Sequence, residues 1–167
     1  MLERIWNGWR SSYVSSAGQA ADGAVGSVFT QILNSGLDDI ETNIVHRGQH
    51  CFAILNAFPY GTGHVLVLPY REVGDLEALT ADETAELWPM VTDTVRAIKR
   101  AYKPEGINVG VNLGRPAGGS VSEHLHVHVV PRWTGDANFM TAVANTRTLP
   151  EALVDTATKI RAAWPGQ

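Results

Sequence analysis

The sequence predicts an α+β fold in which an antiparallel sheet of about five strands packs against helices on one face. Two observations support this prediction. Short runs rich in β-branched and aromatic residues recur at 43–48, 50–58, 63–69, 107–114 and 123–131, separated by turn-like segments. Two longer segments, 80–102 and 150–164, carry helix signals. With 167 residues, 44% of them apolar, the chain is long enough to form one domain with a buried core.

The elements are expected in the following order along the chain. Residues 1–42 form an N-terminal arm with a short amphipathic helix over 3–14, and residues 43–167 form the globular domain. The first three β-rich runs follow one another closely, which predicts an antiparallel meander. The runs at 107–114 and 123–131 add two more strands, joined by the glycine-containing loop 115–122.

The long helix is expected to begin at Thr80, because Glu83 follows three residues later and the pair can form a capping box. Pro89 lies inside this segment and cannot donate a hydrogen bond to the carbonyl of residue 85. We therefore expect a kink or a break after the first turn and a half. The tail offers a strand-like run at 139–144 and a helix from Pro150 to about residue 164.

Composition excludes several classes of partner. The net charge is −4 and the sequence pI is near 5.8, so there is no overall basic field for nucleic acid or an anionic membrane surface. The sequence contains no apolar run of membrane-spanning length and no signal-peptide core in residues 1–14. Cys51 is the single cysteine, which excludes an internal disulfide and favours a reducing cytoplasm.

The run "EHLHVHVV", residues 123–130, places histidine at every second position. Successive side chains of a strand point to opposite faces, so one face carries the apolar residues and the other carries the three imidazoles. The outer two imidazoles should lie about 13 Å apart, too far for all three to bind one metal. The residues concerned are Leu125, Val127 and Val129 on the apolar face and His124, His126 and His128 on the other.

Three interpretations of this run compete. Two of the histidines could bind a metal with a third ligand from His46, His50 or His64. The run could also be a histidine-rich, half-exposed strand without chemistry. We favour a row of imidazoles facing a phosphate chain, because imidazole can be a nucleophile or a donor near pH 7. The preceding Gly118, Gly119 and Ser120 support this interpretation, since glycine amides and a hydroxyl can approach phosphate closely.

The motif His-Leu-His-Val-His-Val-Val, residues 124–130, resembles the signature of the histidine triad superfamily. Two further segments resemble that family: residues 55–73 with an additional histidine at His64, and "NVGVNLG" with Asn112 at the place of an active-site asparagine. The resemblance covers about residues 43–149. Ser120, where many relatives have glutamine, points to the phosphorylase subgroup of the fragile-histidine-triad branch.

The resemblance implies a nucleotidyl transferase in which His126 attacks the α-phosphorus of a dinucleoside polyphosphate. Phosphate would then release ADP from the adenylylated histidine, so that diadenosine tetraphosphate yields ADP and ATP. Water would instead give AMP and ATP, which is the hydrolase alternative, and a nucleotide-binding protein without turnover is another. His124 and His64 would brace the row. The phosphate oxygens would be held by His128, Asn112, Ser120 and the amide of Gly119.

The remaining implied roles concern the nucleosides, metals and assembly. Asn56 would contact the ribose beside Leu55, Phe29 or Ile32 would cover the base, and Trp133 would shape the second nucleotide pocket. Ser27 and Thr30 stand where zinc-containing relatives carry cysteines, so no zinc or other cofactor is expected beyond a divalent cation such as Mg²⁺ bound with the substrate. The resemblance also implies a homodimer with a continuous sheet.

Overall fold

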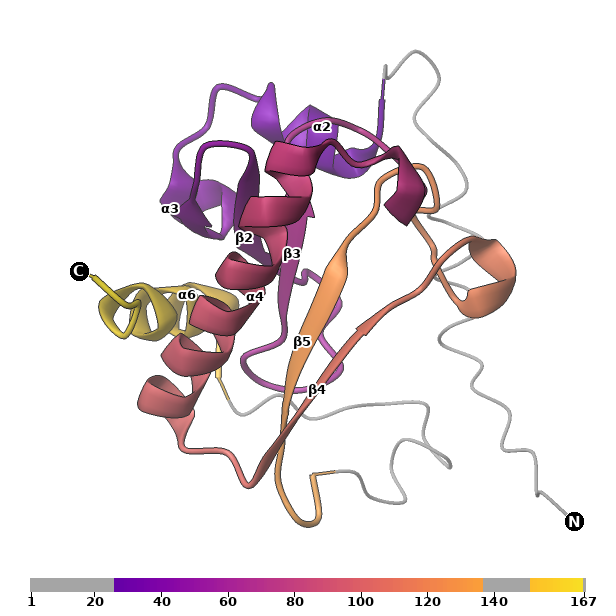
Figure 1. The fold of residues 1–167 in the computed structure, drawn as a ribbon. Coiled ribbons are helices and arrows are strands. Elements are labelled where there is room, and N and C mark those ends of the chain that lie inside the picture. Colours follow the sequence, from indigo (N-terminus) through magenta and orange to yellow (C-terminus); the bar gives the residue numbers. More distant parts are fainter. Residues whose placement is uncertain (1–25, 137–150, 167) are drawn as a thin grey trace, which may run out of the picture.

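The computed structural model describes residues 26–136 and 151–166. Five strands form one sheet in the order β1-β2-β3-β5-β4, and every neighbouring pair is antiparallel (Figure 1). The predicted sheet is therefore confirmed. The strands are β1 (Ile44–Arg47), β2 (Cys51–Leu55), β3 (Val65–Pro69), β4 (Gly106–Val111) and β5 (Val127–Arg132).

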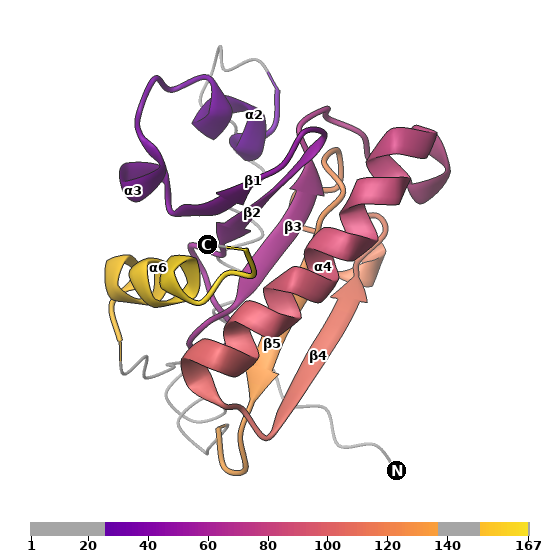
Figure 2. The same ribbon diagram turned by 60° about the vertical axis from the view of Figure 1, so that its left-hand side comes forward.

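Two helices, α4 (Ala81–Tyr102) and α6 (Leu153–Ala162), lie along one face of the sheet (Figure 2). The apolar stripe of α4 packs there against the apolar side of the histidine-containing run, which confirms the predicted alternation. The buried residues in this layer include Leu87, Val91 and Ile98 from α4 and Leu125, Val127 and Val129 from the run.

The opposite face of the sheet is partly covered by α2 (Val28–Leu33), whose Phe29 is buried. A short helix, α3 (Asp39–Thr42), follows and leads into β1. Residues 26–42 thus pack on the domain, whereas the expected helix 3–14 lies outside the described residues. Phe29 shares its cluster with Ile44, Phe52, Ile54, Leu66 and Leu68.

Helix α4 begins as predicted, with both hydrogen bonds of the Thr80–Glu83 capping box present. The expected break at Pro89 is wrong, because α4 runs on to Tyr102 with the proline inside it. Pro89 and Ala85 both lie on the exposed face of the helix, so water can solvate the carbonyl that loses its partner. The buried residues on the other face pack against the sheet on both sides of the proline, which favours a continuous helix.

The remaining elements differ from expectation in their bounds. Helix α6 starts at Leu153 rather than at Pro150, and the strand-like run 139–144 lies outside the described residues. Strand β5 starts only at Val127, because the Leu125 amide donates to the Val73 carbonyl (2.6 Å) instead of joining the sheet ladder. Short 3₁₀ turns occur at Leu76–Ala78 (η1) and Arg115–Ala117 (η2). None of the helices in the described ranges is long and apolar enough to cross a membrane.

Candidate active site

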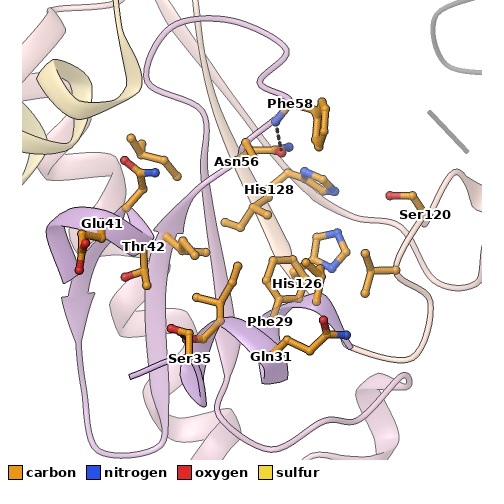
Figure 3. A pocket seen from close by; sticks show the side chains of 18 of the residues that line it. Phe29, Gln31, Ser35, Glu41, Thr42, Asn56, Phe58, Ser120, His126 and His128 are labelled. Atoms are coloured by element: carbon orange, nitrogen blue, oxygen red, sulfur yellow. Dashed lines mark hydrogen bonds between the residues drawn. The ribbon is translucent and has the colours of Figure 1, made fainter. Parts of the chain in front are cut away.

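A pocket of about 470 Å³ opens between α2, the end of β2 and the histidine-containing run (Figure 3). Its lining is mostly apolar and includes amide, hydroxyl and imidazole groups, as expected for a small-molecule site. It is lined by Val28, Phe29, Gln31, Ile32, Ser35, Leu37, Glu41, Thr42, Asn43, Ile54, Leu55, Asn56, Ala57, Phe58, Tyr60, Leu66, Gly118, Ser120, Val121, His126 and His128.

His126 points into this pocket with 7% of its surface exposed. Its Nδ1 lies 2.8 Å from the carbonyl oxygen of His124. A carbonyl can only accept, so Nδ1 carries the proton and the lone pair is left on Nε2. Burial lowers the pKa of His126, which favours the neutral ring. The carbonyl that orients the ring thus belongs to the backbone of the first histidine in the row.

His128 is held in the opposite tautomer by a chain of hydrogen bonds that begins at a backbone amide. The amide of Tyr60 donates to Nδ1 of His64 (3.0 Å), so in the neutral ring of His64 the proton is on Nε2. This Nε2 lies 3.0 Å from Nδ1 of His128 and donates to it. The proton of a neutral His128 is therefore on its Nε2, so the amide group of Asn112, 3.4 Å away, must present its oxygen to this proton and keep its NH₂ free to donate elsewhere.

His124 does not line the pocket and is fully buried. Its Nε2 donates to the carbonyl of Pro69 (2.9 Å), and its Nδ1 lies 2.7 Å from the hydroxyl of Ser27. Burial lowers the pKa of His124, so the ring is neutral and Nδ1 accepts the Ser27 proton. His64 is also buried, with 1% of its surface exposed. Neither His124 nor His64 lines the pocket, so each contacts the lining residues from the side facing the protein interior.

The loop before the run differs in one respect from the sequence prediction. Ser120 and Gly118 line the pocket, but the amide of Gly119 donates to the carbonyl of Gly114 (3.2 Å). The prediction that this amide faces phosphate is therefore wrong. A Cβ on Gly119 would stand 3.1 Å from the carbonyl oxygens of Asn112 and Gly114, so glycine lets the backbone pack closely there without a shift of either carbonyl.

Only some of the residues expected near the nucleosides line this pocket. Asn56 lines the pocket together with Leu55, Phe29 and Ile32. Its Oδ1 accepts from the amide of Phe58 (2.9 Å), as Figure 3 shows. Its Nδ2 lies 3.4 Å from His64 Nδ1.

Trp133 follows the far end of β5 and makes an edge contact with Tyr102, with ring centroids 6.5 Å apart. Trp133 is not among the described residues that line this pocket, and its role in a second nucleotide pocket stays a prediction. It follows the last residue of a six-residue strand whose first residue lies beside the pocket, and such a strand spans about 20 Å.

Several lining residues were not found from the sequence. The ring of Tyr60 stacks on His128 with centroids 5.6 Å apart, and Gln31, Glu41 and Thr42 add polar groups at the opposite rim. The turn "PYGTG" before His64 could have indicated Tyr60, because a residue four positions before a buried histidine can cap its ring. Lysine and arginine are absent from the described lining, so the pocket offers no basic side chain of that kind to a polyphosphate.

The place of the cysteine pair in zinc-containing relatives is occupied by a hydrogen-bonded group. The Ser27 hydroxyl lies 3.2 Å from that of Thr30, and the Thr30 hydroxyl donates to Oε2 of Glu72 (2.6 Å). Neutral hydroxyls are poor zinc ligands compared with thiolates. In the group formed by these residues and His124, only the imidazole and the carboxylate are side chains that usually bind zinc. The group therefore does not fit a structural zinc.

These features together define a histidine triad protein. The HIT domain model matches residues 38–135, and the chain belongs to this family. It is 44% identical over 170 residues to "AP-4-A phosphorylase" from Mycobacterium tuberculosis, covering 99% of this chain and 86% of the relative. Among solved structures, a hypothetical histidine triad nucleotide-binding protein from Sulfolobus tokodaii is 31% identical with a TM-score of 0.65, covering 81% of this chain and 89% of that one. A zinc-bound histidine triad family protein from Mycobacterium smegmatis is 26% identical with a TM-score of 0.65, covering 81% and 91%.

Proposed function

We propose that this chain is a nucleotidyl transferase that cleaves diadenosine tetraphosphate by phosphorolysis to ADP and ATP. The observation that carries the proposal is the ring of His126, which lines the pocket with Nδ1 held by a carbonyl and the lone pair left on Nε2. The relationship to the mycobacterial AP-4-A phosphorylase, which extends over nearly the whole chain, supports the choice of substrate and reaction.

In the first step Nε2 of His126 forms a bond to the α-phosphorus, and the bond between that phosphorus and the bridging oxygen breaks. The leaving group is ATP, and the enzyme keeps AMP on the histidine. In the second step an oxygen of inorganic phosphate attacks the same phosphorus, which releases ADP and restores the neutral ring. Water at this step would give AMP instead.

The charge that builds up on the phosphoryl oxygens and on the leaving oxygen requires donors in the pocket. We assign this role to the Nε2–H of His128, the side chain of Asn112 and the hydroxyl of Ser120. Each donor of this kind is worth about 2.7–4 kcal/mol in the transition state. His64 fixes the tautomer of His128 and is a positioning residue.

The nucleoside would occupy the apolar part of the pocket. Phe29, Ile32 and Leu55 supply the surface against which a base can pack, and Asn56 at the end of β2 would meet the ribose. We further propose that the protein needs no resident metal or cofactor and that Mg²⁺ enters with the polyphosphate. Elemental analysis of the purified protein, together with activity after chelation and restoration by Mg²⁺ alone, tests this part.

We also propose a homodimer in the cytoplasm, with no nucleic-acid or membrane partner. Strand β4 is at the edge of the sheet, and Val109 and Leu113 expose 44% and 43% of their surfaces there. A second copy could continue the sheet along this edge. Light scattering of the wild type should give twice the chain mass, and Val109→Lys should shift it toward the monomer. A monomeric wild type would contradict this assembly.

Product analysis with and without inorganic phosphate tests the reaction. We expect ADP and ATP in equal amounts and little turnover without phosphate. AMP formed at the same rate without phosphate would show a hydrolase instead. His126→Ala should abolish turnover while nucleotide binding is retained, and His50→Ala, at a histidine outside the pocket lining, is the matched control.

A further inference from the structure

A segment outside the sheet reaches both the histidine row and the helix that covers the pocket. This segment, residues 72–74, follows β3 and lies beside residues 122–125. The carbonyl of Val73 accepts from the Leu125 amide at 2.6 Å. That amide belongs to the same peptide group whose carbonyl, on His124, accepts from Nδ1 of His126. The hydrogen bond to Val73 therefore fixes the peptide that orients the reacting ring.

The side chain of the preceding residue, Glu72, makes the second connection. Its Oε2 accepts from the amide of Ser27 (2.7 Å) and from the hydroxyl of Thr30 (2.6 Å), both at the start of α2. These hydrogen bonds lower the pKa of Glu72, so the carboxylate is charged. The chain passes close to it, since a Cβ on Gly26 would stand 2.9 Å from the same oxygen.

The hydroxyl protons in this group can be assigned. The Thr30 hydroxyl donates to Glu72, because a carboxylate only accepts. His124 carries its proton on Nε2, which donates to the Pro69 carbonyl, so its Nδ1 must accept from the Ser27 hydroxyl at 2.7 Å. The Ser27 oxygen in turn accepts from the Thr30 amide at 3.2 Å. Each of these donors thus has a definite acceptor. The hydrogen bonds connect Glu72 to Thr30, Thr30 to Ser27, and Ser27 to the ring of His124.

We propose that Glu72 is a positioning residue for catalysis, acting through Thr30 and Ser27 on His124 and through α2 on the pocket. Rings carried by these parts touch one another: Phe29 of α2 has its centroid 5.4 Å from that of His124 and 5.5 Å from that of His126. Loosening α2 thus disturbs the reacting ring directly.

The inference rests on the proposed function for its kinetic test, so it needs a second readout. We expect Glu72→Ala to lower kcat for diadenosine tetraphosphate about tenfold, by analogy with the lower end of what residues that orient metal ligands contribute. Glu72→Gln should recover most of this loss, because the amide oxygen can still accept from Thr30 and Ser27. Glu77→Gln, at an exposed carboxyl on η1, is the matched control and should leave kcat unchanged.

A double-mutant cycle distinguishes an effect transmitted through these hydrogen bonds from a general loosening of the structure. If Glu72 acts through Ser27, then Ser27→Ala combined with Glu72→Ala should lower kcat no further than the stronger single variant. Effects that multiply, or a Glu72→Ala kcat within twofold of wild type in folded protein, would overturn the proposal. Urea unfolding of each variant establishes that it is folded under the assay conditions.

Nitrogen NMR of the histidine rings provides the readout that does not need turnover. In the wild type the Nδ1 signal of His124 should show a non-protonated nitrogen that accepts a hydrogen bond, and this signal should move in both Ser27→Ala and Glu72→Ala. A signal unchanged in Glu72→Ala would overturn the inference even if the protein proved inactive on diadenosine tetraphosphate. Conversely, a moved signal in a protein without turnover would support the inference and count only against the proposed reaction.

Discussion

Replacing Gly74 with alanine should disturb the histidine row without touching any side chain of the pocket. A Cβ at this position would stand 2.8 Å from the carbonyl oxygen of Ser122, and ordinary contact begins only at about 3.4 Å. The contacted atom is backbone, so the chain itself must shift by about 0.6 Å. The shift falls on residues 122–125, which carry the carbonyl that orients His126.

A misplacement of 1 Å at a reacting group can cost about a hundredfold in rate, so we expect Gly74→Ala to lower kcat about tenfold. Overpacking costs about 1–3 kcal/mol, partly offset by about 0.4–1 kcal/mol from the less flexible unfolded chain. The net loss of stability should therefore be about 1–2 kcal/mol, measured by urea unfolding.

Gly106→Ala is the matched control for Gly74→Ala. Its Cβ would stand 3.9 Å from the Cβ of Arg132, which is ordinary contact, so kcat and stability should stay near wild type. Steady-state kinetics with saturating phosphate would measure both variants. A Gly74→Ala enzyme with kcat within twofold of wild type would refute the reasoning, because it would show that residues 122–125 can move without consequence for the reacting ring.

Three further predictions concern other parts of the molecule. Gly48→Ala should cost about 2 kcal/mol in urea unfolding, because its Cβ would stand 1.8 Å from Oε1 of Glu86 and displace a carboxylate that accepts two backbone amides; an unchanged midpoint would argue against this. Burial lowers the pKa values of His124 and His126, so the unfolded chain binds more protons below about pH 6.5. The free energy of unfolding should accordingly be highest above that pH and fall as the pH drops through the lowered pKa values. The acid limb of kcat/KM should also lie below pH 6.5. A limb at or above pH 7 would contradict a buried neutral nucleophile. Burial raises the pKa of Cys51 to about 12, so thiol reagents at pH 8 should label the native protein far more slowly than the urea-unfolded chain, and rapid native labelling would show that the strand opens.

The strands could be predicted because runs of β-branched and aromatic residues between turn-like segments are visible directly in the sequence. The alternation in residues 124–130 gave the apolar face correctly, and His64 could be placed near the row because its motif resembles the family's second segment. The capping box of α4 could also be predicted, because its two residues lie within one turn of the helix.

What escaped prediction depends on contacts between residues far apart in the chain. Glu72 and Ser27 are 45 positions apart, and nothing in either neighbourhood indicates that they meet. The direction of the Gly119 amide was missed for a related reason, because glycine permits close approach to a ligand and to backbone equally well, and only the fold decides between them. The tolerance of Pro89 depended on which face of α4 was exposed.

The arrangement of hydrogen bonds explains how His126 and His128, whose ring centroids are 4.8 Å apart, can take opposite roles. A backbone carbonyl holds Nδ1 of His126 protonated, so its Nε2 has a free lone pair. A backbone amide, acting through His64, holds Nδ1 of His128 as an acceptor, so its Nε2 carries a proton. Carbonyls only accept and backbone amides only donate, so neither assignment can reverse without breaking a backbone hydrogen bond. In the proposed reaction, nucleophile and donor are thus distinguished by the fold and not by residue type, so His126→Asn and His128→Asn should fail differently. The first should abolish formation of the nucleotidyl-histidine, and the second should slow it while still allowing the intermediate to be trapped.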